Sequence, residues 1–221
     1  AFSQGFIPIY SEYLGHGNEK ESQEFINALA GILISILFFF TIFALIFAPF
    51  FIFIFAPGFY FDNQKQELAV NLLRIMFPYL ALISLVAFAA GIQNSHQRFS
   101  VPAATPLIFN FSLIGAAWLI APTLDVPVMA LAWGVLLAGF LQLLFQIAPL
   151  ALIKKIPIPN FNFANSGVKK FFVIIFPAIL AGGISQINLL IDTIFASLLA
   201  TGSPTWLYVS DRLIQFPLGL F

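Results

Sequence analysis

The chain has 221 residues, of which 61% are hydrophobic and 8% charged, and its formal net charge is zero. A soluble domain carries about 25% charged residues, so this chain cannot cover a water-facing surface, and lipid must be the solvent for much of it. Nine basic and nine acidic residues argue against nucleic-acid binding, and the absence of cysteine excludes disulfides, thiolate metal sites and thiol nucleophiles.

Apolar runs of about 20 residues are long enough to span a bilayer as helices, and such runs recur along the chain. Residues 1–14 predict the end of one spanning helix, and another begins near Thr205. Between them the sequence predicts five fuller spans, at residues 26–56, 68–92, 103–121, 128–153 and 171–200. The first and last of these are longer than a bilayer requires, so we expect them to tilt, bend or protrude. The predicted fold class is an all-α, polytopic transmembrane helix bundle.

The polar linkers between the spans alternate in charge, which predicts an orientation in the membrane. The linkers at residues 15–25, 93–101 and 154–170 carry six lysines and arginines, whereas the opposite set, span ends included, carries three. Because Lys and Arg concentrate in cytoplasmic loops, the first set is predicted to be cytoplasmic. Residues 154–170 contain two lysine pairs and two prolines, and they predict a connector between two helical bundles or a short interfacial helix.

Several predicted spans contain prolines, each of which removes a backbone hydrogen bond and kinks a helix. The stretch "FPAILAGGIS" is the best hinge candidate, because Gly182 and Gly183 follow Pro177 within one span. The alternative is that proline and glycine are simply more frequent in membrane helices than in soluble ones.

The span at residues 171–200 carries one charged residue, Asp192. A charge at the centre of a spanning helix costs about 2.5–3.5 kcal/mol, so it needs a reason. Ser185, Asn188 and Asp192 share one helix face beside Thr193, and this face is predicted to meet other helices or water. A hydrated Asp192 would bind a cation with Asn188 and Thr193, whereas a dry one would carry a proton. The alternative is a carboxyl group that only fixes helix packing.

A second polar constellation lies in "TWLYVSDRLIQFPLG", near the end of the sequence. Asp211 and Arg212 are adjacent, so they point in different directions on a helix and each needs its own partner. The planar guanidinium of Arg212 suits a phosphate or a carboxylate. The alternative is an Arg212 side chain that snorkels to the interface beside a solvated Asp211.

Motifs of catalysis are missing from the sequence. It has no Walker-type glycine loop and no HExxH. Its two histidines, His16 and His96, both stand in polar stretches and are expected to be solvated loop residues, so they offer no Ser-His-Asp set. We therefore expect no enzymatic activity.

Three stretches together resemble the MviN/MurJ family of bacterial lipid II flippases, within the multidrug/oligosaccharidyl-lipid/polysaccharide exporter superfamily. They are "AFSQGFIPIYSEY" at residues 1–13, "GIQNSHQRFSVPAATPLIFNFSLI" at residues 91–114 and "LLIDTIFASLLATGSPTWLYVSDRLIQFPLGLF" at residues 189–221. No single motif would suffice, and it is their order and spacing over nearly the whole chain that carries the resemblance.

The resemblance implies a fourteen-helix transporter with two lobes around a cationic cavity. Residues 1–153 would form part of the first lobe, residues 154–170 the cytoplasmic connector, and residues 171–221 the start of the second lobe. The implied cargo is lipid II, the undecaprenyl-pyrophosphate-linked peptidoglycan precursor, moved by alternating access to the outer leaflet of the bacterial cytoplasmic (inner) membrane for cell-wall synthesis. The expected partners are this precursor and membrane lipid, with no nucleic acid and no organic cofactor.

The resemblance also implies roles for individual residues. Asp211 and Arg212 match the family's Asp-Arg pair on the eighth helix and would belong to a substrate pathway or gate. Ser3 and Gln4 match the polar end of the second-helix motif and would belong to the same pathway. Asp192 matches an acidic position that would help form a monovalent-cation site, so Na⁺ or proton coupling is expected. The family's first-helix arginines are missing, so the chain is expected to be an internal fragment.

Other functions stay open on the sequence alone. A drug/cation antiporter of the same superfamily would use the same lobes with an acidic pocket, and an exporter of another polyprenyl-linked saccharide would differ only in its cargo. A membrane scaffold would transport nothing. Arginines upstream of this sequence would favour an anionic cargo, and carboxylates a cationic one.

Overall fold

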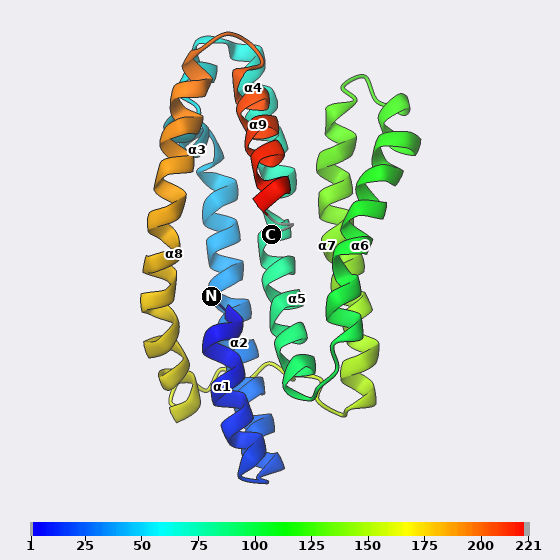
Figure 1. The fold of residues 1–221 in the computed structure, drawn as a ribbon, viewed down its shortest axis with the longest axis vertical. Helices are drawn as coiled ribbons and strands as arrows, with labels where there is room; N and C mark the ends of the chain where they lie inside the picture. The colour runs from blue at the N-terminus through cyan, green and yellow to red at the C-terminus, as the bar shows by residue number, and fades with distance from the viewer. Residues whose placement is uncertain (1, 219–221) are drawn as a thin grey trace.

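The structure is a computed structural model that describes residues 2–218, without the side chains of residue 185 and residues 215–218. The regular elements of this range are helices, most of which run along one common axis (Figure 1). In chain order they are α1 (Phe2–Gly15), α2 (Glu19–Ile46), α3 (Ala48–Phe55), η1 (Pro57–Phe61), α4 (Asn63–Met76), α5 (Pro78–Ser95), α6 (Ser100–Gly115), η2 (Ala116–Ile120), η3 (Ala121–Thr123), α7 (Val128–Leu152), α8 (Ser166–Leu198) and α9 (Ser203–Leu218).

Five helical stretches of the described chain are long and apolar enough to cross a membrane. They are Glu19–Ile46, Asn63–Ser95, Ser100–Thr123, Val128–Leu152 and Ser166–Leu198. Each of these stretches overlaps one of the five predicted spans, so an all-helical, multi-pass membrane protein is confirmed for the described residues. The first and last begin earlier than predicted because asparagine caps extend them into the polar linkers: Asn18 accepts from the Glu21 N–H at 3.3 Å, and Asn165 from the Val168 N–H at 3.2 Å.

The span predicted at residues 26–56 divides into two helices, α2 and α3. Pro49 has no N–H, so it fits the first turn of a new helix better than the interior of a continuous one. It also leaves the Leu45 carbonyl without its helical donor, and the Nε of Arg74 in α4 donates to that carbonyl at 3.3 Å. The expected bend is therefore a proline break, stabilised by an arginine of a neighbouring helix.

Other prolines differ in their effect on the helices. Pro78 begins α5, whereas α6, α7 and α8 continue through Pro106, Pro149 and Pro177. A proline in these spans therefore does not by itself end the helix.

An aromatic core ties α1 to the rest of the bundle. Phe6 of α1 is fully buried, and its ring centroid lies 5.2 Å from that of Tyr10 and 5.9 Å from that of Phe25 in α2. Pairs of this kind contribute about 0.5–1.5 kcal/mol beyond their buried area. Phe171 and Ile175 of α8 belong to the same cluster, so the core joins α8 to α1 and α2 as well.

A buried polar network joins α5, α6 and α7. Gln93 of α5 donates from Nε2 to the Gln146 Oε1 of α7, and Gln146 donates from Nε2 to the Thr105 hydroxyl of α6 at 2.7 Å. Gln142 donates to the Thr105 backbone carbonyl at 3.2 Å, and all four side chains are buried. The four side chains are shielded from solvent by the surrounding helices, so these bonds fix how the three helices pack.

The linkers predicted to be cytoplasmic lie together at one end of the molecule, the lower end in Figure 1. The opposite end carries η1 and the turns that join α6 to α7 and α8 to α9 (Figure 1). This grouping agrees with the predicted alternation of the linkers, whereas the orientation itself stays a prediction from charge. The two ends are therefore called the cytoplasmic end and the exoplasmic end.

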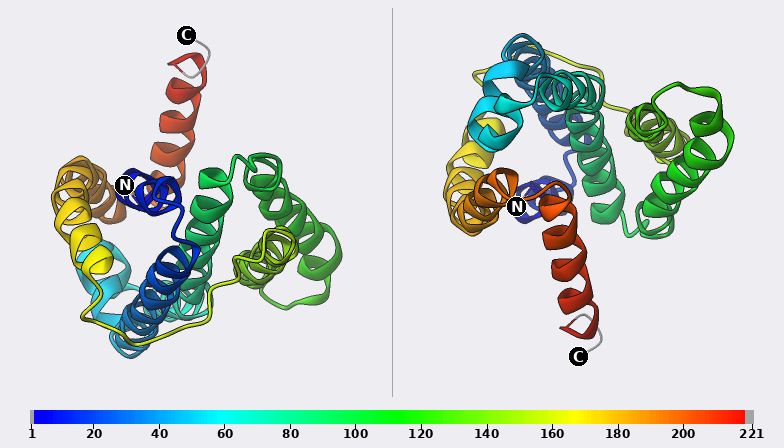
Figure 2. Two further views of the ribbon diagram at one scale, coloured as in Figure 1. Left: turned by 90° about the horizontal axis from the view of Figure 1, so that it is seen from below. Right: turned by 90° about the horizontal axis from the view of Figure 1, so that it is seen from above.

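The connector between α7 and α8 runs past the cytoplasmic end of α2 (Figure 2, left) and forms no interfacial helix. Asn27 of α2 accepts the Ile158 N–H at its side-chain oxygen, at 2.8 Å, and the Asn160 N–H at its backbone carbonyl, at 3.0 Å. At Gly31, one turn further along α2, a Cβ would lie 2.4 Å from the Asn160 carbonyl oxygen. Residues 156–160 are therefore fixed to α2. The division into lobes at residues 153 and 170 stays a prediction.

Candidate functional site

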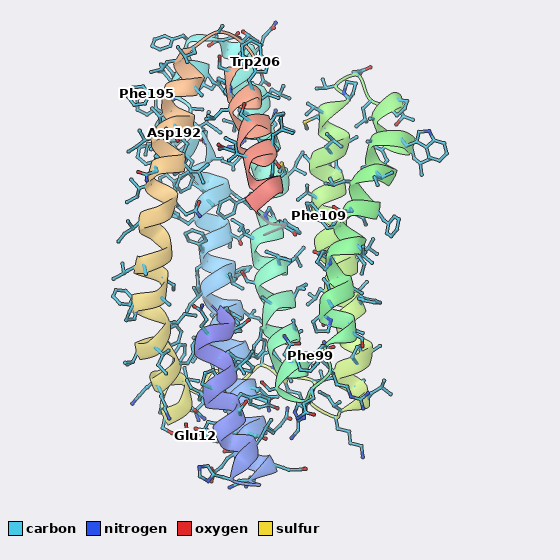
Figure 3. All side chains as sticks on the ribbon, viewed as in Figure 1. Glu12, Phe99, Phe109, Asp192, Phe195 and Trp206 are labelled. Carbon is cyan, nitrogen blue, oxygen red and sulfur yellow. The ribbon has the colours of Figure 1, made fainter. Side chains whose placement is uncertain are left out.

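Helix α8 carries Asp192 closer to the exoplasmic end than to its midpoint (Figure 3). The helix runs from Ser166 to Leu198, so Asp192 lies in its last third. The cost assumed for a charge at the centre of a span is therefore too high for this residue, because the penalty falls toward the interface. Exoplasmic water is a realistic partner for this carboxylate.

The other members of the predicted cation site lie beside Asp192 on α8. Asn188, Asp192 and Thr193 are all exposed in the described chain. The Thr193 hydroxyl donates to the Leu189 carbonyl at 2.7 Å, which leaves lone pairs on its oxygen free to bind a cation. The described residues contain no cluster of three His, Cys, Asp or Glu side chains that could hold a metal. The cation role stays a prediction, and the Ser185 side chain lies outside the described residues.

Helix α9 positions Arg212 through an interaction that the sequence analysis did not anticipate. Its Nε donates to the Tyr208 hydroxyl at 3.1 Å, and the guanidinium carbon lies 5.2 Å from the centroid of that ring. The sequence signal that could have predicted this interaction is the i, i+4 spacing of a tyrosine and an arginine on one helix. The bond to Nε leaves the two terminal nitrogens of the exposed guanidinium available to an anion.

The remaining predicted site residues lie on exposed helix faces. Ser3 and Gln4 are exposed on α1. In α8, Pro177, Gly182 and Gly183 are also exposed, and a Cβ at either glycine would meet nothing within 4 Å. Packing within this chain therefore does not require glycine at these two positions. Both the hinge and the roles of Ser3 and Gln4 stay predictions.

The described residues do not bring these side chains into one constellation. Their ion pairs are Asp62–Lys65, at 3.1 Å, and Glu12–Lys170. Asp192, Asp211 and Arg212 take part in neither. Helices α8 and α9 diverge from the turn that joins them (Figures 1 and 2).

A contact between distant segments at the exoplasmic end was missed by sequence reasoning. The Gly58 N–H of η1 donates to the Ser197 hydroxyl of α8 at 3.2 Å, and Lys65 Nζ of α4 donates to the Thr201 hydroxyl at 3.1 Å. We call these four residues the exoplasmic junction. A cavity of about 470 Å³ lies beside them. Gly58 and Ser197 are 139 positions apart, and nothing in their local sequences pairs them.

At the cytoplasmic end, His96 was wrongly placed in a solvated loop. It is half-buried, and its Nε2 lies 3.1 Å from the Tyr10 hydroxyl of α1. Burial lowers the pKa of His96, and the positive charge of Lys155 lowers it further, whereas Glu19 opposes the shift. The side chain therefore favours its neutral form and can share a hydrogen bond with Tyr10.

Comparisons with known proteins agree over the whole chain. A family model described as "Lipid II flippase MurJ" matches residues 1–221. Proteins named "Probable lipid II flippase MurJ" are 40% identical in Haemophilus influenzae and 41% identical in Buchnera aphidicola, covering 100% and 99% of this chain but 45% and 43% of those proteins. A solved structure titled "Lipid II flippase MurJ, inward closed conformation" matches with a TM-score of 0.81 and 26% identity, covering 99% of this chain and 44% of that one. The chain thus spans less than half the length of these relatives.

Proposed function

This chain belongs to the MurJ family of lipid II flippases, and on that premise we propose that it works in a flippase that moves lipid II. The movement runs from the cytoplasmic to the outer leaflet of the bacterial inner membrane and supplies cell-wall synthesis. The relatives at 36–41% identity bear the name of this activity, which supports lipid II over another polyprenyl-linked saccharide or a cationic drug as the cargo. The family is one of transporters rather than enzymes.

The physical task explains why such a protein needs polar groups inside apolar helices. A pyrophosphate headgroup cannot cross hydrocarbon without partners, because burying an uncompensated charge costs many kcal/mol. The flippase must offer the headgroup a wet, polar route while the lipid tail stays in the membrane. Two lobes that rock about a central site can open this route to one side at a time.

One observation carries the proposal: α8 and α9 present charged groups on surfaces that pack against nothing else in the described chain. Asp192 and Arg212 are both exposed, and neither has an ion-pair partner among the described residues. In a membrane such groups face water, cargo or another helix rather than lipid. We assign Arg212, oriented by Tyr208, to the cargo's pyrophosphate or to a gate that closes over it, with Asp211 beside it.

Coupling to an ion is the second part of the proposal. Asp192 supplies a carboxylate, Asn188 an amide oxygen and Thr193 a hydroxyl, which are oxygen donors of the type that hard cations take. These three residues fit Na⁺ as part of a ligand set, and Asp192 alone would serve a proton. Occupation of this site would favour one arrangement of the lobes over the other.

Complementation tests the proposal. A bacterium depleted of its own lipid II flippase should grow when it carries the full-length gene of this protein, and it should not grow with Arg212→Ala. Lys169→Ala removes an exposed charge at the cytoplasmic end and serves as the matched control, with normal growth expected. Failure of the unmodified gene would overturn the proposed function. Normal growth with Arg212→Ala would remove only the role of that residue.

A further inference from the structure

We infer that the exoplasmic junction is the contact that closes the outer side of the transport route, and that it breaks whenever that side opens. Gly58 and Ser197 are its central pair. This inference rests on the proposed alternating-access function and adds the residues that hold one of its states. It concerns the positioning of the lobes, since the junction residues are not assigned to cargo binding.

The backbones at Gly58 and Ser197 approach so closely that only a hydrogen atom fits between them. A Cβ on Gly58 would lie 1.7 Å from the Ser197 carbonyl oxygen and 2.3 Å from its carbonyl carbon. Both atoms belong to the backbone of α8, so a rotamer change cannot relieve the overlap. Any larger residue at position 58 therefore forces η1 and α8 apart.

The polar bonds of the junction are few and suited to being broken and remade. The Ser197 hydroxyl accepts from the Gly58 N–H and donates to the Ile194 carbonyl at 2.7 Å, so it needs no further partner while the junction is closed. The Lys65 ammonium, which binds Thr201, is also held by Asp62 at 3.1 Å and is partly exposed. Water can replace these bonds when the two segments separate.

The position of the junction in the fold lets it restrain the exoplasmic half of α8. Helix α8 meets the first lobe near its cytoplasmic end, where Phe171 and Ile175 enter the aromatic core, and again at the junction (Figure 1). Between these two contacts most of its residues are exposed. Loss of the junction would loosen the exoplasmic half of α8, which would keep its packing against α3, while its other end stays anchored in the aromatic core.

Crosslinking measures whether the junction is formed. These 221 residues contain no cysteine, so Lys65→Cys with Thr201→Cys, introduced into the full-length protein after any cysteine outside them is replaced, gives a pair that a short, cleavable thiol crosslinker can join when the junction is closed. Adding Gly58→Ala should lower the ratio of crosslinked to uncrosslinked protein by about tenfold or more, because overpacking against backbone is costly. Gly115→Ala, where a Cβ meets nothing within 4 Å, is the matched control and should leave crosslinking unchanged.

Two further measurements keep the inference refutable. Ser197→Ala retains the close approach but loses the hydroxyl, so it should fold normally and lower crosslinking less than Gly58→Ala does. Unchanged crosslinking in both variants would overturn the inference. In vesicles, the crosslinked pair should not move lipid II until the crosslinker is cleaved. If crosslinking responds as expected but the cleaved protein moves no lipid II, the proposed function fails and the junction stands.

Discussion

The buried network of α5, α6 and α7 permits a quantitative test of what holds these three helices together. Replacing Gln146 by leucine keeps the side-chain volume nearly constant but removes the acceptor of Gln93 and the donor to Thr105. The Oε1 of Gln93 already has no hydrogen-bond partner, so in this variant all of its side-chain polar atoms would be unpaired and buried. An unpaired buried group costs about 1–3 kcal/mol, and interhelical bonds in membranes average about 0.6 kcal/mol. We expect Gln146→Leu to cost about 1–2 kcal/mol.

A double-mutant cycle separates the bond from general effects of substitution. Gln93→Leu alone should also destabilise, because it leaves the Gln146 Oε1 unpaired. The double variant pairs two leucines, so its cost should fall short of the sum by about 1 kcal/mol. The measurement is reversible unfolding of the full-length protein in detergent micelles, followed by circular dichroism. Gln64→Leu, the same exchange at an exposed position, is the control and should stay within about 0.5 kcal/mol. Equal costs for Gln146→Leu and the control, or strict additivity, would refute the reasoning.

Three further changes test the connector, the cytoplasmic end and the hinge. Gly31→Ala sets a Cβ against the connector backbone and should destabilise by about 1–3 kcal/mol, whereas Gly115→Ala should gain up to about 1 kcal/mol, so equal melting temperatures would argue against a fixed connector. Burial lowers the folded-state pKa of His96, so the free energy of unfolding should be highest above the ordinary histidine pKa of about 6.5 and should fall as the pH drops below that value. His96→Phe should make the free energy of unfolding less dependent on pH in this range, and an unaltered pH dependence would contradict the assignment. Gly182→Ala with Gly183→Ala meets open space and should stabilise α8 by up to about 2 kcal/mol while slowing transport in vesicles, and undiminished transport would remove the hinge.

The sequence predicts the helices well because hydropathy alone decides which segments enter lipid. The five spans, their order and the grouping of the basic linkers at one end all follow from composition and charge. The sequence does not predict which prolines break their helices. The helix breaks at Pro49, where Arg74 supplies a substitute donor from a distant segment, and it continues through Pro177.

The candidate site is less predictable because its parts come together only in three dimensions. The sequence identifies Asp192 and Arg212, since charged residues in apolar runs stand out. It does not reveal that Tyr208 orients Arg212, because a tyrosine near the end of a span already has an interfacial explanation. Gly58 and Ser197 escape notice altogether, since neither is unusual in its own segment and their contact depends on the packing of α8 against η1.

The bonds between Asn27 and the connector have a consequence for how far the start of α8 can move away from α2. With residues 156–160 held on α2, the slack between that anchor and the first turn of α8 is confined to residues 161–165. Five fully extended residues reach about 17 Å, which is an upper limit on the tether. The first turn of α8 can therefore rotate about this short tether, but it stays within about that distance of residue 160 whichever way the helices rock.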